Sequence, residues 1–229
     1  MRNVVVTGVP RADSDAVDTL AGYGVATVHE AMGRTGYLGT RLRPVVAGAR
    51  VAGTAVTALC WPGDNLMLHV AVEQCRPGDI LVAAPTSPCT DGMFGELLAT
   101  SLRSRGVRGV VIDAGVRDVA DLRAMGFPAW SAAVSAQGTV KATAGAVNVP
   151  LAIGGQTIAP GDAIVADDDG VVVVPRADAG TAVTAARARV EKEENTRGAL
   201  ADGQLGLDRY GLRDVLDRLG VQYVPYEGA

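Results

Sequence analysis

Residues 79–133 read DILVAAPTSPCTDGMFGELLATSLRSRGVRGVVIDAGVRDVADLRAMGFPAWSAA, and the order of strands and helices in the core can be predicted from this segment. Short runs of Val, Ile, Leu and Ala alternate in it with segments whose apolar residues recur at helical spacing. The alternation predicts a β-α-β-α-β unit with parallel strands and right-handed crossovers. The predicted order is strand Asp79–Pro85, helix Phe94–Arg105, strand Val107–Asp113, helix Asp118–Met125 and strand Phe127–Ala133.

The flanking segments continue this α/β pattern. In the helix that starts at Phe94, the residues Phe94, Leu97, Leu98 and Leu102 are expected on one apolar stripe. Turn residues and periodicity predict the remaining elements. These are helices over 14–21, 25–33, Asn65–Cys75, 177–195 and Leu212–Leu219, a strand over 45–59 that Gly48 and Gly53 interrupt, and hairpins over Pro150–Pro175.

Composition excludes several classes of protein. Of 229 residues, 48% are hydrophobic and 20% charged, and the formal net charge is −4. The arginines are scattered and there are only two lysines, Lys141 and Lys192, so we expect no nucleic-acid groove. The uncharged stretch Ala142–Gly161 contains Asn148 and Gln156, so we expect no membrane helix. Three cysteines without CxxC spacing are typical of a reduced, cytoplasmic protein.

Charged residues follow two neighbouring strands of the predicted sheet. Ligands of open parallel sheets bind beyond the carboxyl ends of the strands. Glu96 follows the first strand, and Arg117 and Asp118 follow the second, so we expect the three to approach one another. The start of the helix after Phe94 also offers free backbone N–H groups for an anion. The alternative is purely structural: Asp118 caps a helix and Arg117 is its surface neighbour.

Other candidate residues point less clearly to chemistry. His29 and His69 lie far apart in sequence, and His69 is expected to be packed in an apolar helix. The cysteines lack the spacing of zinc ligands, and Asp167–Gly170 is expected to be a hairpin turn. GxSxG and GxxxxGK[ST] are absent. An enzyme built on this chain would therefore use carboxylates and an oxygen-preferring metal, Mg²⁺ or Mn²⁺, with no organic cofactor.

Six segments in chain order carry a family resemblance. They are GVATVHEAMGRTG (24–36), PGDNLMLHVAVEQCRPGD (62–79), FGELLATSLRSRGVRGVVIDAGVRD (94–118), VSAQGTVK (134–141), PGDAIVADDDGVVVVP (160–175) and LGLDRYGLR (205–213). Together they resemble the 4-hydroxy-4-methyl-2-oxoglutarate / 4-carboxy-4-hydroxy-2-oxoadipate aldolases, which are class II, metal-dependent pyruvate aldolases of bacterial aromatic-acid degradation. The wider family includes a ribonuclease E regulator.

The resemblance implies a fold and an assembly. The family's fold is an α/β, swivelling β/β/α domain with a partly parallel central sheet, and its members form trimers or hexamers. The chain is then one aldolase domain over 1–229, with N-terminal helices in 1–40 and the β/β/α core in 41–175. Residues 176–229 would form a C-terminal helical arm that packs on a neighbouring subunit of a homotrimer or homohexamer.

The resemblance also implies roles for individual residues. The family signature is an acidic residue, twenty residues, and then Arg-Asp, which Glu96 and Arg117-Asp118 match, although Asp is frequent at the first position. The backbone of Gly95, Glu96, Leu97 and Leu98 would hold the substrate carboxylate, Arg117 would contact the 2-oxo acid end, and Asp118 would ligate Mg²⁺ or Mn²⁺. A glutamate of a neighbouring subunit would complete the site, and Glu193 matches best among Glu191, Glu193 and Glu194.

The implied reaction is retro-aldol cleavage of a 4-hydroxy-2-oxo acid. 4-Carboxy-4-hydroxy-2-oxoadipate would give pyruvate and oxaloacetate, 4-hydroxy-4-methyl-2-oxoglutarate would give two pyruvates, and oxaloacetate decarboxylation would be a side reaction. Water oriented by Glu96 and Glu193 would take the C4 hydroxyl proton. The alternatives are a dedicated oxaloacetate decarboxylase and a non-enzymatic binding protein like the ribonuclease E regulator. A methyltransferase ranks last, because no glycine-rich cofactor turn follows the first strand.

Overall fold

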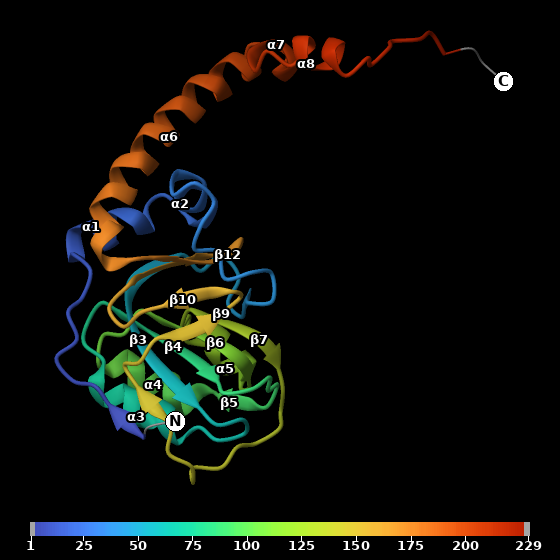
Figure 1. The fold of residues 1–229 in the computed structure, drawn as a ribbon. Helices are drawn as coiled ribbons and strands as arrows, with labels where there is room; N and C mark the ends of the chain where they lie inside the picture. Colours follow the sequence, from blue (N-terminus) through green and yellow to red (C-terminus); the bar gives the residue numbers. More distant parts are fainter. Residues whose placement is uncertain (1–2, 227–229) are drawn as a thin grey trace. The chain divides into compact units, whose positions relative to one another are not determined.

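The structure, a computed structural model, describes residues 3–226. The chain divides into two compact units, one ending at Arg187 and one beginning at Ala188. The boundary falls inside helix α6 (Ala179–Ala201). Every strand of the described residues belongs to the first unit (Figure 1).

The first unit is built on a mixed sheet whose middle is parallel. Four strands lie side by side and parallel in the order β3 (Val51–Cys60), β4 (Asp79–Pro85), β6 (Gly109–Val116) and β7 (Ala129–Val134). Almost all residues of β3, β4 and β6 are buried, as expected for parallel strands that are covered on both faces. The predicted β-α-β-α-β unit is therefore confirmed.

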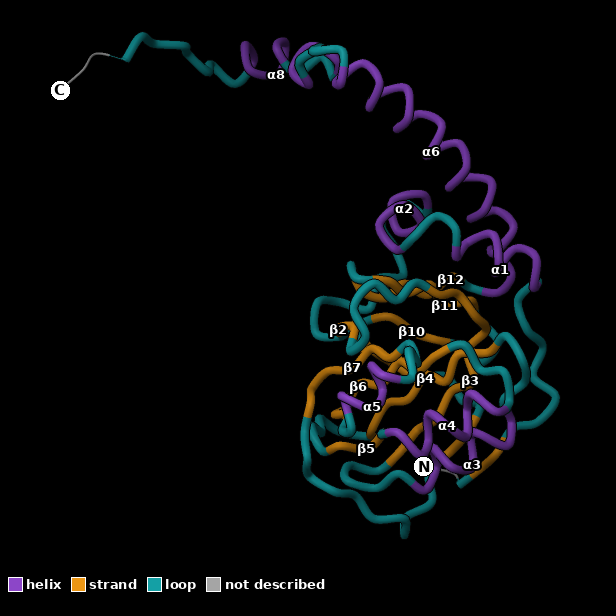
Figure 2. Tube along the Cα trace, turned by 180° about the vertical axis from the view of Figure 1, so that it is seen from behind, coloured by secondary structure: helices purple, strands orange, loops and turns teal. Residues whose placement is uncertain are grey.

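Three helices cover one face of this sheet. α3 (Leu66–Gln74), α4 (Glu96–Ser104) and α5 (Val119–Ala124) pack there, as Figure 2 shows from behind. Leu98, Ala99 and Leu102 of α4 face the core. Leu97 was expected on the same stripe, but its side chain is 76% exposed. It lies one residue, about 100° of helical rotation, from Leu98, which places it outside the buried face.

A second layer of strands lies on the other face. It contains the two-stranded sheet of β9 (Leu151–Ile153) and β10 (Gln156–Ile158) and the hairpin of β11 (Ala163–Asp167) and β12 (Gly170–Val174). The hairpin is continuous with the main sheet, because β11 pairs antiparallel with the first residues of β3. Trp130 of β7 is fully buried between the layers, and its Nε1 donates to the Asp167 carbonyl at 2.8 Å. The hairpins expected over 150–175 are confirmed.

Helices also cover the outer side of the β11–β12 hairpin. α1 (Ser14–Ala21), α2 (Val25–Ala31) and the first turns of α6 pack there around Leu20, Val28 and Ala182 (Figure 1). The first unit is thus layered as helices, parallel sheet, hairpin strands and helices. This arrangement confirms the predicted α/β class and its partly parallel sheet, with helix α6 following as the C-terminal extension.

The remaining elements are short. They are β1 (Val4–Val5), β2 (Arg43–Pro44), β5 (Gly92–Phe94), β8 (Ala146–Val147), η1 (Arg176–Asp178), α7 (Gly206–Arg209) and α8 (Arg213–Arg218). β5 was not predicted, because three residues are too few to show a periodicity. α6 extends to Ala201, beyond the predicted end at residue 195.

Three predicted strands differ in their bounds, and the one expected over Phe127–Ala133 is β7, which begins at Ala129 and ends at Val134. The strand expected over 45–59 begins only at Val51, because Gly48 takes a left-handed φ of 74° and donates its N–H to Asp168. Gly53 does not interrupt it. A Cβ there would lie 2.6 Å from the Gly78 carbonyl oxygen, so glycine permits the close approach of the turn before β4. The strand expected to end at Asp113 continues to Val116.

β6 continues past Asp113 because an ion pair stabilises the charge of this residue. Its carboxylate is half-buried and lies 3.3 Å from the Arg41 guanidinium. Burial raises the pKa of Asp113, and the Arg41 charge acts in the opposite direction. The ion pair lets a charged residue stay within a buried strand.

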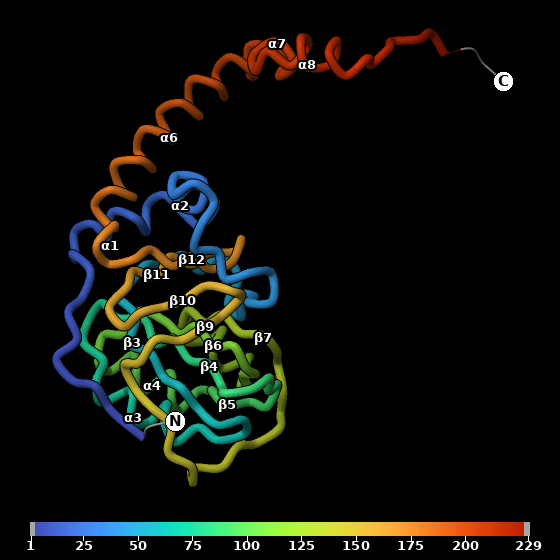
Figure 3. Tube along the Cα trace, viewed as in Figure 1, coloured from blue at the N-terminus to red at the C-terminus, as the bar shows by residue number. Residues whose placement is uncertain are grey.

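The second unit contains the rest of α6 together with α7 and α8. No described residue from 188 to 226 is buried. Several large apolar side chains there are mostly exposed, namely Leu205, Tyr210, Leu219, Tyr223 and Tyr226. The segment after α8 is extended as far as Tyr226 (Figure 3). Within residues 3–226, no helix has the length and apolarity needed to cross a lipid bilayer.

Candidate functional site

The two predicted loops meet at one edge of the sheet. β5 pairs with the end of β6, with Gly92 opposite Gly115 and Phe94 opposite Val116. The Arg117 N–H donates to the Phe94 carbonyl at 2.9 Å. The prediction that the segments after β4 and β6 emerge together is confirmed, and the backbone itself fixes their spacing.

Glycine permits the close contact between the loops. A Cβ on Gly95 would lie 2.4 Å from Asp118 Oδ2 and 3.0 Å from Arg117 Cγ. A Cβ on Gly115 would lie 2.2 Å from the Thr90 carbonyl oxygen. Real Cβ atoms do not approach other atoms so closely, so both positions need glycine if the loops are to stay where they are.

Asp118 occupies an unusual backbone conformation. Its φ of 55° and ψ of 39° lie in the left-handed region, which Asp and Asn tolerate better than other non-glycine residues. It stands at the N-cap of α5 but makes no capping hydrogen bond with its side chain. Instead, Oδ2 accepts from the Glu96 backbone N–H at 3.2 Å and lies 3.5 Å from Arg117 Nε. The alternative in which Asp118 merely caps its own helix is therefore wrong.

The start of α4 offers donors at the same place. The first N–H to bond within the helix is that of Ala99, which donates to the Gly95 carbonyl at 3.1 Å. The N–H groups of Leu97 and Leu98 precede it and have no acceptor within the helix. Together with the helix dipole, these donors favour a bound carboxylate or phosphate.

Glu96 reaches the site with its backbone rather than with its carboxylate. Its Oε1 accepts from the Thr100 hydroxyl at 2.7 Å, one turn further along α4. The side chain lines a groove of about 680 Å³ between α4 and α5, together with Thr100, Arg103, Asp121, Ala124 and Met125. Sequence spacing predicted the position of Glu96 but not this direction of its side chain.

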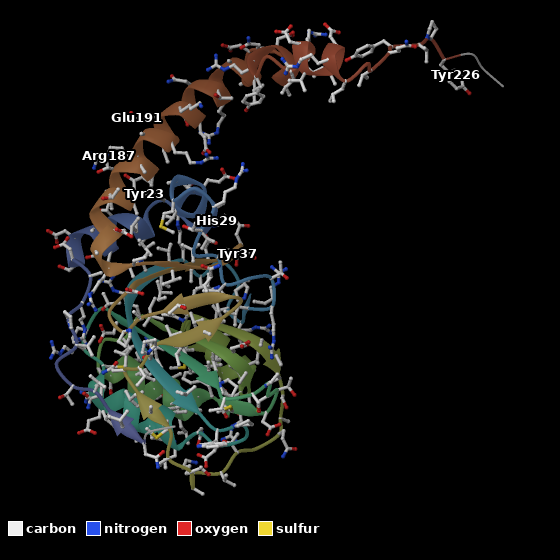
Figure 4. The ribbon with its side chains drawn as sticks, viewed as in Figure 1. Tyr23, His29, Tyr37, Arg187, Glu191 and Tyr226 are labelled. Carbon is white, nitrogen blue, oxygen red and sulfur yellow. The ribbon has the colours of Figure 1, made fainter. Side chains whose placement is uncertain are left out.

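The three candidate glutamates of α6 belong to the unit that begins at Ala188. Glu193 forms an ion pair with Arg189 at 2.8 Å, and Glu194 pairs with Arg197. Glu191 is exposed on the same helix (Figure 4). Residues 95–98, 117 and 118 belong to the other unit.

Two polar residues near β5, Asp64 and Asn65, were not predicted from the sequence to lie near the site. The Asn65 side chain donates to the Met93 carbonyl at 3.0 Å, two residues before Gly95. Its Oδ1 is buried and has no hydrogen-bond partner. Burial raises the pKa of Asp64, but the N–H groups of Leu66, Ala142 and Thr143 outweigh that effect and lower it below the usual range. The sequence signal is PGDN at 62–65.

The structure also shows the surroundings of the two histidines, the Asp167–Gly170 segment and the three cysteines. His69 was expected to be packed, but its side chain is exposed, because it lies on the outer side of α3. His29 lies beside Tyr37, with ring centroids 5.6 Å apart (Figure 4). Asp167–Gly170 forms the predicted hairpin turn. The three cysteines are free and buried, and burial raises the pKa of Cys60 and of Cys75 to about 12, so these thiols are poor nucleophiles.

Comparisons with known proteins agree on one family. The family model RraA-like, described as Aldolase/RraA, matches residues 25–173. A protein of Halalkalibacterium halodurans, provisionally named 4-hydroxy-4-methyl-2-oxoglutarate aldolase, is 30% identical over 173 residues, which cover 76% of this chain and 82% of that protein. A protein of Burkholderia multivorans with the same provisional name is 34% identical over 158 residues, which cover 68% of this chain and 96% of that protein.

A solved structure is equally similar. Streptomyces coelicolor RraAS2, described as an unusual member of the RNase ES inhibitor RraA protein family, superposes with a TM-score of 0.73 at 31% identity. The match covers 82% of this chain and 98% of that structure. The relatives thus include proteins named as aldolases and a protein grouped with ribonuclease inhibitors.

Proposed function

The chain belongs to the RraA-like family, and on that premise we propose that it is a metal-dependent aldolase that cleaves 4-hydroxy-2-oxo acids. Its substrates would be 4-carboxy-4-hydroxy-2-oxoadipate and 4-hydroxy-4-methyl-2-oxoglutarate. The observation that carries the proposal is the side chain of Asp118. It leaves its own helix uncapped and faces the start of α4 beside Arg117. The names of the two aldolase-like relatives support the reaction class.

The donor set fits a hard divalent cation. Within residues 3–226, no group of three or more His, Cys, Asp or Glu residues is arranged to hold a metal. Mg²⁺ commonly binds through one or two carboxylates and keeps several water molecules, so a single aspartate suits it better than it suits zinc. Asp118 would hold the ion, which would polarise the 2-oxo carbonyl of the substrate.

The chain's own groups would bind the reacting end of the substrate. The N–H groups of Leu97 and Leu98 would hold the C1 carboxylate. The side chain of Arg117 is 45% exposed, so its guanidinium is available to the C2 oxygen. Negative charge develops on that oxygen when the C3–C4 bond breaks, and Arg117 would stabilise it. C3 then takes a proton to give pyruvate, and the C4 carbonyl compound leaves.

The proton of the C4 hydroxyl would pass to water held by carboxylates. We propose Glu96 for this role, with its side chain turned from Thr100, and Glu193 of a neighbouring subunit. The same charge development would make oxaloacetate decarboxylation a side reaction. Its product would also be pyruvate, so the two activities must be compared with separate substrates.

The assembly we propose is a homotrimer or a homohexamer. The second unit has no buried residue among those described, and Leu205, Leu219 and Tyr223 expose most of their apolar surface. Such an arm needs a covering surface, and a neighbouring subunit would supply it. Sedimentation equilibrium of the full chain tests this, and a monomer at micromolar concentration would contradict it. The buried, free cysteines fit a cytoplasmic location.

A coupled assay for pyruvate tests the activity. Purified protein with Mg²⁺ or Mn²⁺ should release pyruvate from 4-hydroxy-4-methyl-2-oxoglutarate, EDTA should abolish the release, and added metal should restore it. The similarity to RraAS2 supports a second candidate, a protein that binds a ribonuclease. No pyruvate from any 2-oxo acid with either metal, together with a stable ribonuclease complex, would favour that candidate.

A further inference from the structure

The segment 134–141 carries part of the family resemblance, yet no residue of it takes part in the proposed reaction. It connects β7 to β8 and runs along the lower edge of the first unit, beneath β5, in Figures 1 and 2. Its last residue, Lys141, is the only lysine of the first unit, because Lys192 belongs to the second.

Backbone hydrogen bonds fix this segment at the edge where the site lies. The Ser135 N–H donates to the Val116 carbonyl, and the Gly92 N–H donates to the Gln137 carbonyl, both at 2.9 Å. A Cβ on Gly92 would lie 2.4 Å from the Ser135 carbonyl oxygen and 3.1 Å from Arg117 Cβ, so Gly92 has the segment and Arg117 as its nearest neighbours.

The part around Lys141 is anchored to the start of α3. The Val140 N–H donates to the Gly63 carbonyl at 2.9 Å, and the Val140 carbonyl accepts from Asn65 N–H at 3.0 Å. On the other side of Lys141, the Ala142 N–H donates to the Asp64 carboxylate at 2.9 Å. Lys141 therefore stands between two fixed residues.

Lys141 has no carboxylate partner in the described part of the chain. Its side chain is exposed, and no ion pair joins it to a carboxylate among residues 3–226. Asp64 is 2% exposed, and backbone N–H groups engage its carboxylate. The backbone bonds of Val140 and Ala142 to residues 63–65 place Lys141 beside the start of α3. Desolvation and then the Lys141 charge lower the pKa of His69 on that helix, which agrees with this position.

We propose that Lys141 binds the carboxylate at the far end of the substrate, the end remote from the 2-oxo acid. The inference rests on the proposed function and deepens it, because it assigns the specificity for dicarboxylates to one side chain. Arg117 and the start of α4 would bind one carboxylate. Lys141, whose backbone neighbours are held at the same edge of the sheet and which has no ion pair within residues 3–226, would bind the second. The C4 carboxylates of both proposed substrates supply such a group.

Isothermal titration with two matched probes tests the proposal. 2-Oxoglutarate and 2-oxopentanoate have the same chain length and differ only in a terminal carboxylate against a methyl group. With Mg²⁺ present, the wild-type protein should bind 2-oxoglutarate about tenfold or more tightly than 2-oxopentanoate, the size of a charge-assisted hydrogen bond. Lys141→Met should remove this preference and leave the affinity for 2-oxopentanoate within about twofold.

Two variants control the measurement. Lys192→Met removes the other lysine and should keep the preference, and Lys141→Arg should keep most of it, because the charge remains. Equal loss of both affinities in Lys141→Met would show a structural role and overturn the proposal. So would a preference that survives in Lys141→Met, and so would a wild-type protein that shows none. Pyruvate release is measured separately, so a protein that binds as expected without turnover contradicts the proposed function and not this subsite.

Discussion

The two units of the chain differ in how their structure is supported. The first unit has three hydrophobic clusters, built on both faces of the sheet and over the outer hairpin. The second has no buried residue among those described. Its helix α6 is instead rich in alanine and carries charge pairs one turn apart, such as Arg189 with Glu193, which favour a helix locally.

This difference separates two groups among the residues that we propose for the site. Arg117 and Asp118 stand on loops that a packed core holds in register, so their spacing exists before any ligand binds. Glu193 stands on a helix that the core supports only at its first turns. We infer that the first unit carries the reacting groups and that the second contributes only once a partner surface orders it.

Replacing the charge at position 118 should give the largest effect. Asp118→Asn keeps a residue that tolerates the left-handed φ of 55° but removes the anionic ligand. We expect pyruvate release to fall by about a thousandfold, with a Tm within about 2 °C of the wild type, because the fold of the first unit does not need the charge. Asp178→Asn, on the exposed η1, is the matched control. Near-normal turnover of Asp118→Asn would disprove the assigned site.

Crowding the loops should give the next largest effect. In Gly95→Ala, the added methyl group would lie 2.4 Å from Asp118 Oδ2, so the carboxylate or the helix start has to move. Displacements of this size cost about a hundredfold in rate, which kcat/KM for 4-hydroxy-4-methyl-2-oxoglutarate would report. Gly180→Ala adds the same group where no heavy atom lies within 4 Å, and it should leave kcat/KM unchanged. Equal rates for the two variants would mean that the loop spacing does not matter.

The contribution of the arm is tested by neighbouring glutamates on α6. Glu193→Gln should lower kcat by about tenfold to a hundredfold, the usual cost of losing a residue that orients a ligand through water. Glu191→Gln changes the same group two positions away and should stay within about twofold. Since both residues lie in the unit without a core, neither should change the Tm of the first unit. The reverse ranking would assign the role to Glu191.

The smallest effect concerns stability. The pKa of Asp64 is lowered, because N–H donors outweigh burial, so the folded state favours the charged carboxylate. This contribution is present at pH values above about 4, where the unfolded carboxyl is also charged, and it is lost as the pH falls through the lower folded pKa. Asp64→Asn should remove about 2 kcal/mol of unfolding free energy at pH 7 and flatten the dependence on pH below 4. Urea titrations at several pH values measure both.

Sequence pattern predicted the part of the fold that periodicity determines. β4 has the predicted bounds, and the parallel order of β4, β6 and β7 follows from buried runs alternating with helices. The position of Arg117 and Asp118 beside the start of α4 followed from topology. What topology cannot supply is the direction of a side chain. Local tertiary packing determines three features that the hydrophobic periodicity of the sequence does not predict. These are the hydrogen bond from Thr100 to Glu96, the exposure of Leu97 and the left-handed backbone of Asp118.

The backbone at Asp118 has a consequence for how such a family diversifies. Residues that accept a left-handed φ are few, chiefly Gly, Asn and Asp. A single base change turns an aspartate codon into a codon for asparagine or glycine. A descendant of this chain can therefore lose the Asp118 charge, for which we propose a role in catalysis, in one step and keep the fold of the domain. If the proposed function holds, such a single step would give a folded protein without the activity, which could still bind other macromolecules.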